Sequence, residues 1–397
     1  MLPRVKILYE NGALGLVSPS ADGLLGIIVN GVSVSSTFVL NTPYLLSSYD
    51  DLATMGINSS NNPAIEKLLR EFYAEAGAGV QVWLMGTSQS QSMANMLDIT
   101  VENSARKLVE TSGGAIRGII VSHNPANGYS PTITDGINAD VWAAIAKGQE
   151  LGEWSADTKF APLFVIVDGR NYQGNAALLR DLTQQSDNRV GVLIGDTTSS
   201  AGSALGLLAG RIAKIPVQRN IGRVADGAVN SLTMYIKDKA AEMVDVTQLH
   251  DKGFITFRTF VGRSGYFFTD DTLATLTSDD YRFLTHRRTA DKAYRIAYDT
   301  LLNFLLDEIP VTSGGKILPA LVKSWQTEVE SAIASQMTAN GELSADPSNA
   351  KDRGVECFID ENQNVISTGK LEMTIRVRPF GYARYIDAKL GFTVISN

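Results

Sequence analysis

Two carboxylates stand where an α/β enzyme could hold a catalytic group. Asp168 ends the apolar run FVIVD, and Asp196 ends the run VLIGD. Open α/β sheets bind ligands at the carboxyl ends of their strands, so a hydrolase or a nucleotide-binding protein could use these aspartates. Such carboxylates are also common without catalysis, and nothing in the sequence selects this pair for acid–base work. We predict no catalytic residue and keep an α/β enzyme or nucleotide-binding protein, with its site near Asp168 and Asp196, as the alternative.

Glycines follow the second of these carboxylates, but their spacing does not suit a phosphate-binding loop. No Walker A motif occurs, and no Gly-x-Gly-x-x-Gly opens a helix after a strand. Gly202, Gly206 and Gly210 recur every four residues and would share one face of a helix, which favours close helix packing. The stretch 262–265 (GRSG) only resembles a nucleophile elbow. We therefore predict no cofactor-binding residue.

The residues that most often bind metals are scattered. His123, His250 and His286 lie far apart and belong to no cluster with metal-ligand spacing. Cys357 is the single cysteine, which excludes an internal disulfide framework and a cysteine-based zinc cluster. It falls in a predicted strand, where a small buried apolar role is favoured over nucleophilic chemistry. We predict no metal site.

Composition narrows the class of protein further. The 397 residues carry 35 basic and 42 acidic side chains, a net charge of −7, without a long basic run, so a general nucleic-acid binder is not expected. Residues 1–15 do not resemble a secretory signal. The apolar stretch 160–167 is far shorter than the roughly 20 residues of a membrane helix. These features predict a soluble protein, or part of a soluble assembly, without membrane insertion.

Up to about residue 275 the chain alternates helices with buried strands. Near-continuous Val/Ile/Leu strands separated by helices are typical of a parallel or mixed sheet with helices on both faces. The predicted strands are 23–28, 80–84, 115–122, 161–168 and 189–195, and the predicted helices begin at Pro63 and span 93–111, 139–151 and 174–184. We predict an α/β domain over residues 15–275, itself open to subdivision.

The pattern then changes to α+β. Apolar stripes predict two long helices, 290–305 and 318–333, followed by a polar loop at 341–354 and strands at 355–360 and 371–377. Apolar residues alternate again almost to the last residue. We predict a C-terminal domain over 276–383, a C-terminal strand or arm over 384–397, and an N-terminal arm over 1–14.

The two terminal strands are features that a self-contained enzyme would not need. The apolar positions that alternate along them are Val5, Ile7 and Tyr9 near one end, and Ile386, Leu390, Phe392 and Val394 near the other. A bare strand exposes unpaired backbone groups and can add to the sheet of another chain. The alternative is that the two termini pair within their own subunit.

Basic residues crowd the first half of the first long helix: Arg287, Arg288, Lys292 and Arg295. Positive charge near a helix N-terminus opposes the macrodipole and costs about 0.3–1 kcal/mol where it is poorly screened. Either Asp279 and Asp280 offset this charge locally, or the basic residues face an acidic partner.

Several segments, in this order, resemble the contractile tail sheath proteins of bacteriophages and of phage-like contractile injection systems. They are 24–30 (LLGIIVN), 46–52 with Met55-Gly56, 63–83, 206–220, 265–272 (GYFFTDDT), the two long helices, and 371–395. The chain departs from the family at three points. Met55 stands where an aromatic is usual, three residues separate Pro216 from Asn220, and 265–272 lacks the family's arginine.

The resemblance implies a non-enzymatic structural subunit. Such subunits form stacked hexameric rings around an inner tube, and their contraction drives the tube through a target envelope. Implied partners are further copies of the chain, the inner tail tube protein, and baseplate and tail terminator proteins, with no direct nucleic-acid contact. Implied surroundings are a virion tail or injection particle, assembled in the bacterial cytoplasm without a cofactor.

The resemblance also implies roles for particular residues. The terminal strands named above would be arms that join neighbouring subunits, and the four basic residues would contact the tube. The acceptor sheet would include Leu371, Met373, Ile375 and Val377. A contractile switch also needs hinges, for which Gly12, Gly15, Pro379 and Gly381 are candidates, with ordinary turns as the alternative. A different homo-oligomeric shell or capsid protein, which would form closed particles, is a third hypothesis.

Overall fold

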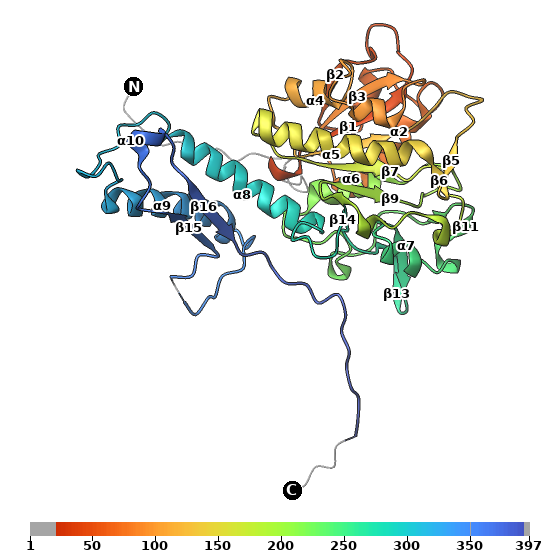
Figure 1. Cartoon of the computed structure of the whole chain (residues 1–397). Helices are drawn as coiled ribbons and strands as arrows, with labels where there is room; N and C mark the ends of the chain where they lie inside the picture. Colours follow the sequence, from red (N-terminus) through yellow and green to blue (C-terminus); the bar gives the residue numbers. More distant parts are fainter. Residues whose placement is uncertain (1–20, 350, 393–397) are drawn as a thin grey trace, which may run out of the picture. The chain divides into compact units, whose positions relative to one another are not determined.

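The computed structural model describes residues 21–349 and 351–392, and the chain falls into two compact units, Met1–Leu302 and Asn303–Asn397 (Figure 1). The units assign the helix at 284–302 to the first unit, whereas the sequence placed it in a domain over 276–383. The predicted domain limits stay predictions.

The first unit is built on a six-stranded mixed sheet. Its strand order is β2-β3-β1-β4-β7-β9, with β2 antiparallel to β3 and every other neighbouring pair parallel. The strands are β1 (Leu25–Gly31), β2 (Pro43–Leu46), β3 (Val82–Ser88), β4 (Gly118–Ser122), β7 (Phe164–Asp168) and β9 (Val190–Leu193). The predicted mixed α/β sheet is confirmed.

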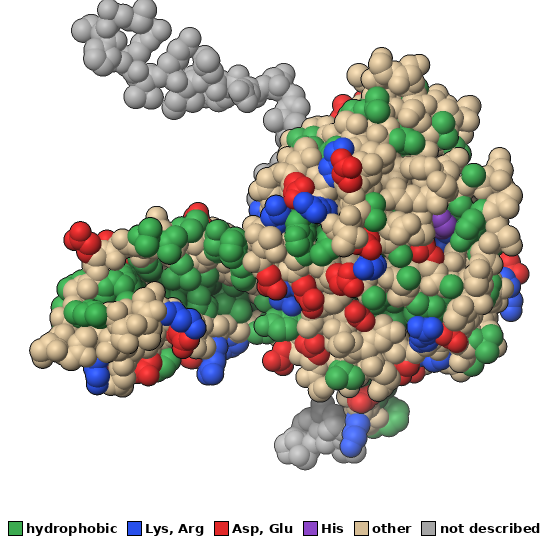
Figure 2. All heavy atoms as spheres, turned by 45° about the horizontal axis from the view of Figure 1, so that its top comes forward, with side chains coloured by type: hydrophobic (Ala, Val, Ile, Leu, Met, Phe, Trp, Pro, Cys, Tyr) green, Lys and Arg blue, Asp and Glu red, His purple; other side chains and the backbone are tan. Residues whose placement is uncertain are grey.

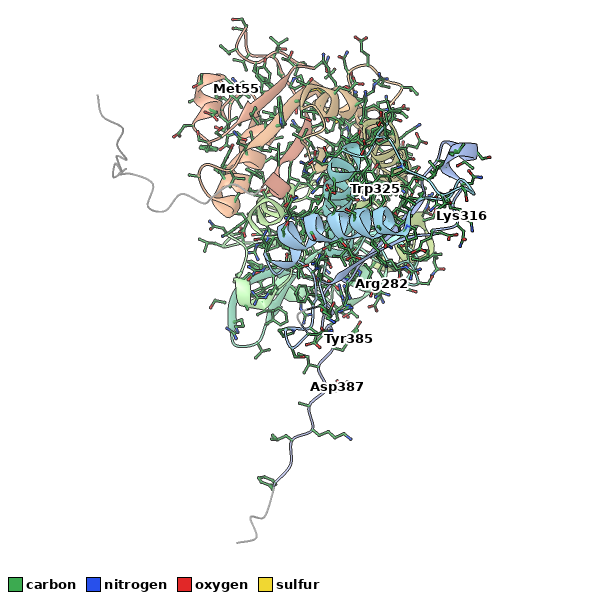
Figure 3. The ribbon with its side chains drawn as sticks, turned by 90° about the vertical axis from the view of Figure 1, so that its left-hand side faces the viewer. Met55, Arg282, Lys316, Trp325, Tyr385 and Asp387 are labelled. Carbon is green, nitrogen blue, oxygen red and sulfur yellow. The ribbon has the colours of Figure 1, made fainter. Side chains whose placement is uncertain are left out.

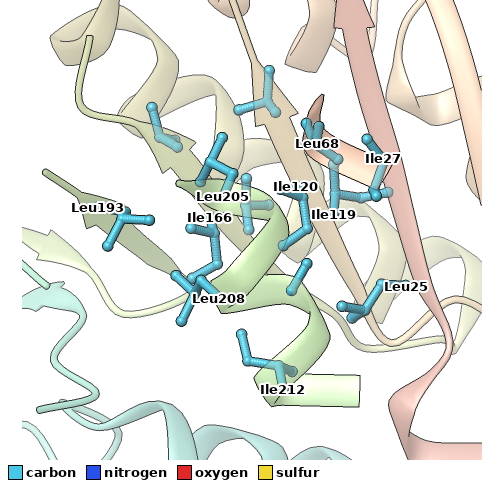
Figure 4. Close-up of a cluster of buried hydrophobic side chains, with 14 of the residues drawn as sticks. Leu25, Ile27, Leu68, Ile119, Ile120, Ile166, Leu193, Leu205, Leu208 and Ile212 are labelled. Carbon is cyan, nitrogen blue, oxygen red and sulfur yellow. The ribbon is translucent and has the colours of Figure 1, made fainter. Parts of the chain in front are cut away.

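Burial explains why these strands lack polar alternation. Every residue of β1 is buried, and Ile27 pairs with Leu84 of β3 on one side and Ile120 of β4 on the other. A central parallel strand is covered on both faces, so it must be apolar on both. Figure 4 shows part of this core, in which Leu205, Leu208 and Ile212 of one covering helix lie beside strand side chains such as Ile166.

The helices of the first unit are α1 (Asp51–Thr54), α2 (Pro63–Ala76), α3 (Met93–Leu97), α4 (Ala105–Thr111), α5 (Ala139–Lys159), α6 (Leu205–Lys214), α7 (Thr247–Asp251) and α8 (Leu284–Leu302). Small two-stranded sheets join β5 (Ile133–Thr134) to β6 (Ile137–Asn138), β8 (Ser186–Asp187) to β14 (Ala274–Thr275), β10 (Tyr235–Ile236) to β11 (Lys239–Ala240), and β12 (Phe257–Phe260) to β13 (Arg263–Phe268). No helix among the described residues is both long and apolar enough to span a membrane.

Two predicted helices differ from the structure for a shared reason. The stretch 93–111 is broken into α3 and α4, and Asp98 in the break accepts hydrogen bonds from the backbone and hydroxyl of Thr100. The stretch 174–184 forms only two short 3-10 turns, where Asn175 and Asp181 accept bonds from backbone N–H groups two residues on. Short polar side chains that bond their own backbone compete with helix formation.

Glycines bring α6 onto α2. A Cβ on Gly206 would lie 2.2 Å from the carbonyl oxygen of Leu68, and one on Gly210 would lie 2.5 Å from that of Phe72. Real Cβ atoms do not approach this closely, so the two helix backbones pack in direct contact. The predicted packing role is confirmed for Gly206 and Gly210. Gly202 was wrongly placed on the same helix face, because it lies in the loop before α6.

The second unit has a small core between a helix and a hairpin. Its elements are α9 (Pro319–Ile333), a π-helical turn (Ala334–Thr338), β15 (Val355–Ile359), α10 (Val365–Thr368) and β16 (Met373–Val377). Trp325 of α9, labelled in Figure 3, packs with Ile317, Val322 and Ile359. Gln326 and Glu330 of α9 bond the backbone of Cys357. Cys357 is buried in β15 as predicted, and burial raises the pKa of its thiol to about 12.

Candidate assembly surfaces

Asp168 lies at the carboxyl edge of the main sheet, as predicted, but its oxygens are engaged inside the fold. Oδ1 accepts a hydrogen bond from Ser203 Oγ at 2.8 Å, and Oδ2 accepts one from the backbone N–H of His123 at 3.4 Å. Burial raises the pKa of this carboxyl to about 6, although Arg170 opposes the rise. Asp168 therefore ties the loop before α6 and the end of β4 to β7.

His123 is buried beside this carboxyl. Its ring makes an edge-to-face contact with Tyr129, and burial lowers the pKa of the imidazole to about 4. The ring is thus uncharged at neutral pH. Within residues 21–349 and 351–392, no group of His, Cys, Asp or Glu side chains is arranged to hold a metal ion.

Asp196 belongs to an ion-pair network that the sequence analysis missed. Lys67 Nζ lies 2.6 Å from Asp196 Oδ1 and 2.7 Å from Glu71 Oε1, and the Thr197 hydroxyl donates to Glu71. Burial raises the pKa of Glu71 although Lys67 opposes it. The network fastens the loop after β9 to α2. The i,i+4 spacing of Lys67 and Glu71 was its one visible signal.

The basic residues at the start of α8 have partners within the first unit. Arg287 lies 3.1 Å from Asp291, and Arg288 donates to the carbonyls of Ile212 and Ile215 at 3.1 and 3.0 Å. Arg288 thus satisfies carbonyl groups left open at the end of α6. Both side chains are buried.

Further along α8, Lys292 and Arg295 both form ion pairs with the carboxylate of Asp22. Lys292 Nζ lies 2.7 Å from Asp22 Oδ2, and Arg295 Nη2 lies 2.7 Å from Asp22 Oδ1. The assignment of Arg287, Arg288, Lys292 and Arg295 to a tube surface stays a prediction.

The start of α8 receives its negative charge from a distant residue. Asp271 Oδ2 accepts a hydrogen bond from the backbone N–H of Thr285 at 2.7 Å, which suits the positive end of a helix. Asp279 instead bonds Asn188 and Thr275. The helix is therefore capped by Asp271, and the interpretation that Asp279 and Asp280 offset the basic charge locally stays a prediction.

The predicted acceptor sheet lies in the hairpin of the second unit. Ile375 pairs with Cys357 and Val377 with Val355. These two partners on β15 are buried, whereas Met373, Ile375 and Val377 are half-buried. Leu371 just precedes β16. Within the part of the chain that is described, β16 pairs only with β15. The hairpin thus presents an open edge beside a partly covered apolar face, and Figure 2 shows hydrophobic side chains gathered on the body that contains this unit.

The segment after the hairpin is extended and solvent-exposed. Residues 380–392 form no strand, Ile386 is 81% exposed, and Leu390 and Phe392 are fully exposed. Tyr385 and Asp387 mark this segment in Figure 3. Pro379 and Gly381, the predicted hinge residues, lie at its start and are exposed. The other predicted arm and hinge residues lie outside the described residues: Val5, Ile7, Tyr9, Gly12, Gly15 and Val394.

Solved structures share this fold along nearly the whole chain. A chain of the anti-feeding prophage baseplate (6-fold symmetrised) has TM-score 0.63 and 15% identity, covering 99% of both chains. The helical sheath of the anti-feeding prophage in its contracted state has TM-score 0.61 and 16% identity, over 98% of this chain and 99% of that one. The contracted PVC sheath complex of an extracellular contractile injection system has TM-score 0.60 and 14% identity, over 98% and 97%. The fold is that of contractile sheath proteins, which confirms the predicted resemblance.

Two family profiles match the sequence itself. The DUF2586 N-terminal domain matches residues 2–272, and the DUF2586 C-terminal domain matches residues 280–396. The chain belongs to the DUF2586 family. None of the curated protein sequences compared with it matches.

Proposed function

We propose that this protein is the structural subunit of a contractile sheath, which polymerises as stacked hexameric rings around an inner tube. Its contraction would drive the tube through a target envelope. The observation that carries this proposal is the shared fold over 98–99% of the chain with chains of contracted sheaths and of a baseplate. A subunit that shared only the α/β sheet would match over a smaller part.

The proposed partners are further copies of the chain, an inner tail tube protein, and baseplate and tail terminator proteins. The proposed setting is a phage tail or a free-standing injection particle, assembled in the bacterial cytoplasm. Of the three solved structures described above, two are sheaths and one is a baseplate, which supports self-assembly and a baseplate contact.

The role we propose is mechanical and not catalytic. The two carboxylates that could have served an enzyme are occupied by Ser203 and Lys67 within the fold. Contraction needs no chemistry at the subunit, because an extended lattice trapped during assembly can relax to one of lower energy. Such a switch needs rigid bodies joined by persistent flexible links.

The links that we propose are the terminal arms. An arm strand that pairs with the open edge of β16 in a neighbouring subunit would gain several main-chain hydrogen bonds, each worth about 0.5–1.5 kcal/mol net. The exposed apolar side chains of 386–392 support this proposal, because pairing would bury them against the half-covered face of Met373, Ile375 and Val377.

Negative-stain electron microscopy of the purified chain, at rising protein and salt concentration and with and without the inner tube protein, tests the proposal. We expect hollow tubes with a ridged wall. Closed particles would point to a shell protein instead. Compact dispersed particles in both settings would contradict the sheath role, and thermal stabilisation by a ligand that Asp168→Asn abolishes would then favour the enzyme.

A further inference from the structure

Asp22 is fixed to α8 by two ion pairs. Asp22 follows the residues predicted to form the N-terminal arm and precedes β1 by three positions. Each of its carboxylate oxygens contacts a different base, Lys292 or Arg295, at 2.7 Å. Lys292 and Arg295 are three positions apart, so they share one face of α8 and can hold a single carboxylate between them.

The surroundings of Asp22 favour its ion pairs with Lys292 and Arg295. All three side chains are 14–16% exposed, so water screens these pairs only weakly. Burial alone would raise the pKa of Asp22, but Lys292 and Arg295 outweigh it and hold the pKa below its usual value. Asp22 is thus ionised at neutral pH.

The adjoining backbone is fixed as well. A Cβ on Gly23 would lie 2.3 Å from the carbonyl oxygen of Ala213, so the chain passes directly against the end of α6. The carbonyl of Leu24 accepts a hydrogen bond from the backbone N–H of Arg117. Residues 22–24 are therefore held from three sides before β1 starts.

This arrangement bears on how tension would travel through the subunit. β1 lies at the centre of the sheet between β3 and β4, and a pull on the N-terminal arm would otherwise act directly on its first residue. α8, in contrast, runs without a break to Leu302, where the chain enters the second unit. A force applied to α8 can reach the second unit through one continuous helix.

We propose that Asp22, held by Lys292 and Arg295, is a joint that passes tension from the N-terminal arm to α8 and on to the C-terminal unit, so that β1 is spared. This inference rests on the proposed sheath function. It gives Lys292 and Arg295 a role in anchoring the arm. It makes Asp22 a positioning residue for assembly.

Three variants and two states of the protein test the joint. Asp22→Asn removes the charge and keeps the size, Asp22→Glu keeps the charge, and Asp299→Asn removes an equal charge from an exposed position on α8. Hydrogen exchange at the β1 amides is measured in monomers and in assembled tubes, and assembly is measured by sedimentation.

We expect Asp22→Asn to leave β1 protected in the monomer. In tubes, where we infer that the arms carry load, that load would pass to the first residue of β1 once the joint is lost. β1 exchange should then rise by about tenfold, which is the order of the free energy of one charge-assisted contact. Sedimentable assembly should fall, Asp22→Glu should retain part of it, and Asp299→Asn should match the wild type.

A further control distinguishes transfer of load through Asp22 from a simple contribution of Asp22 to the stability of the sheet. Val192→Ala destabilises β9, where Val192 is fully buried, without touching Asp22. Because Val192→Ala lowers the stability of the sheet itself, it should raise β1 exchange by the same factor in monomers and in tubes. If Asp22→Asn also raised β1 exchange by the same factor in both states, the joint would be refuted. A wild-type chain that built no tubes would overturn the proposed function, whereas normal tubes from Asp22→Asn with unchanged β1 protection would overturn the joint alone.

Discussion

At the scale of single residues, side chains that could serve catalysis instead make hydrogen bonds and ion pairs that hold loops to strands and helices. In Asp168 and His123 this position is unfavourable to charge, because burial raises the pKa of the carboxyl and lowers the pKa of the imidazole. The sequence placed Asp168 at the carboxyl edge of the sheet, because a strand end is visible in the pattern of apolar residues. It could not show that Ser203 would reach back to the carboxylate, because that contact depends on how the loop before α6 folds.

The opposite pKa shifts of this pair predict opposite pH dependences in two variants. The pKa of Asp168 is raised to about 6, so its contribution to stability is present at low pH and is lost as the pH rises through 6. The pKa of His123 is lowered to about 4, so its contribution is lost as the pH falls from 6.5 toward 4. At about 1.4 kcal/mol per pKa unit, each contribution amounts to roughly 3 kcal/mol. In the wild type the two contributions change with pH in opposite directions.

Relative to the wild type, Asp168→Asn should therefore become more stable as the pH rises from 4 to 6.5, and His123→Gln should become less stable. Urea unfolding at pH 4, 5, 6 and 7 measures this slope, which is independent of any constant loss from repacking. Equal slopes in the two variants would show that the burial of these groups does not set their titration.

At the scale of elements, the sequence predicts the features that depend on a local pattern of apolar residues. It does not predict those that depend on particular side-chain contacts. Strands such as β7 and β4 follow from unbroken apolar runs, and α9 follows from its apolar stripe. The break between α3 and α4 does not, because the bonds of Asp98 outweigh an otherwise helical pattern. The ion pair between Asp22 and Arg295 joins residues 273 positions apart, so no local spacing in the sequence could predict it.

The contact between α2 and α6 predicts that a Gly→Ala substitution in a helix lowers the free energy of unfolding, which is the opposite of its usual effect. Gly→Ala inside a helix normally stabilises by roughly 1 kcal/mol. Gly206→Ala should instead destabilise the first unit by about 1–3 kcal/mol, because its Cβ would overlap the carbonyl of Leu68 and force the helices apart. Urea unfolding measures the change. Gly381→Ala, where a Cβ meets nothing within 4 Å, is the control, and a more stable Gly206→Ala would refute the close packing.

At the scale of the whole molecule, the described segment near the C-terminal end lies outside both hydrophobic cores. The core of the first unit lies around the six-stranded sheet, and that of the second lies between α9 and its hairpin. Residues 384–392 add little to either core, since Ile386, Leu390 and Phe392 are exposed. A segment that a monomer leaves apolar and exposed is explained if another subunit covers it.

Removal of residues 384–397, and separately of residues 1–10, should therefore leave folded monomers that fail to build ordered tubes. We expect the C-terminal truncation to change the free energy of unfolding by less than about 0.5 kcal/mol, because exposed residues contribute little to stability. Circular dichroism and urea unfolding check the fold, and electron microscopy checks assembly. As a matched control, Leu390→Ser with Phe392→Ser keeps the backbone of the arm while removing its apolar side chains. Partial assembly by this variant would assign the rest of the contact to main-chain pairing, whereas normal tubes from either truncation would defeat the arm model.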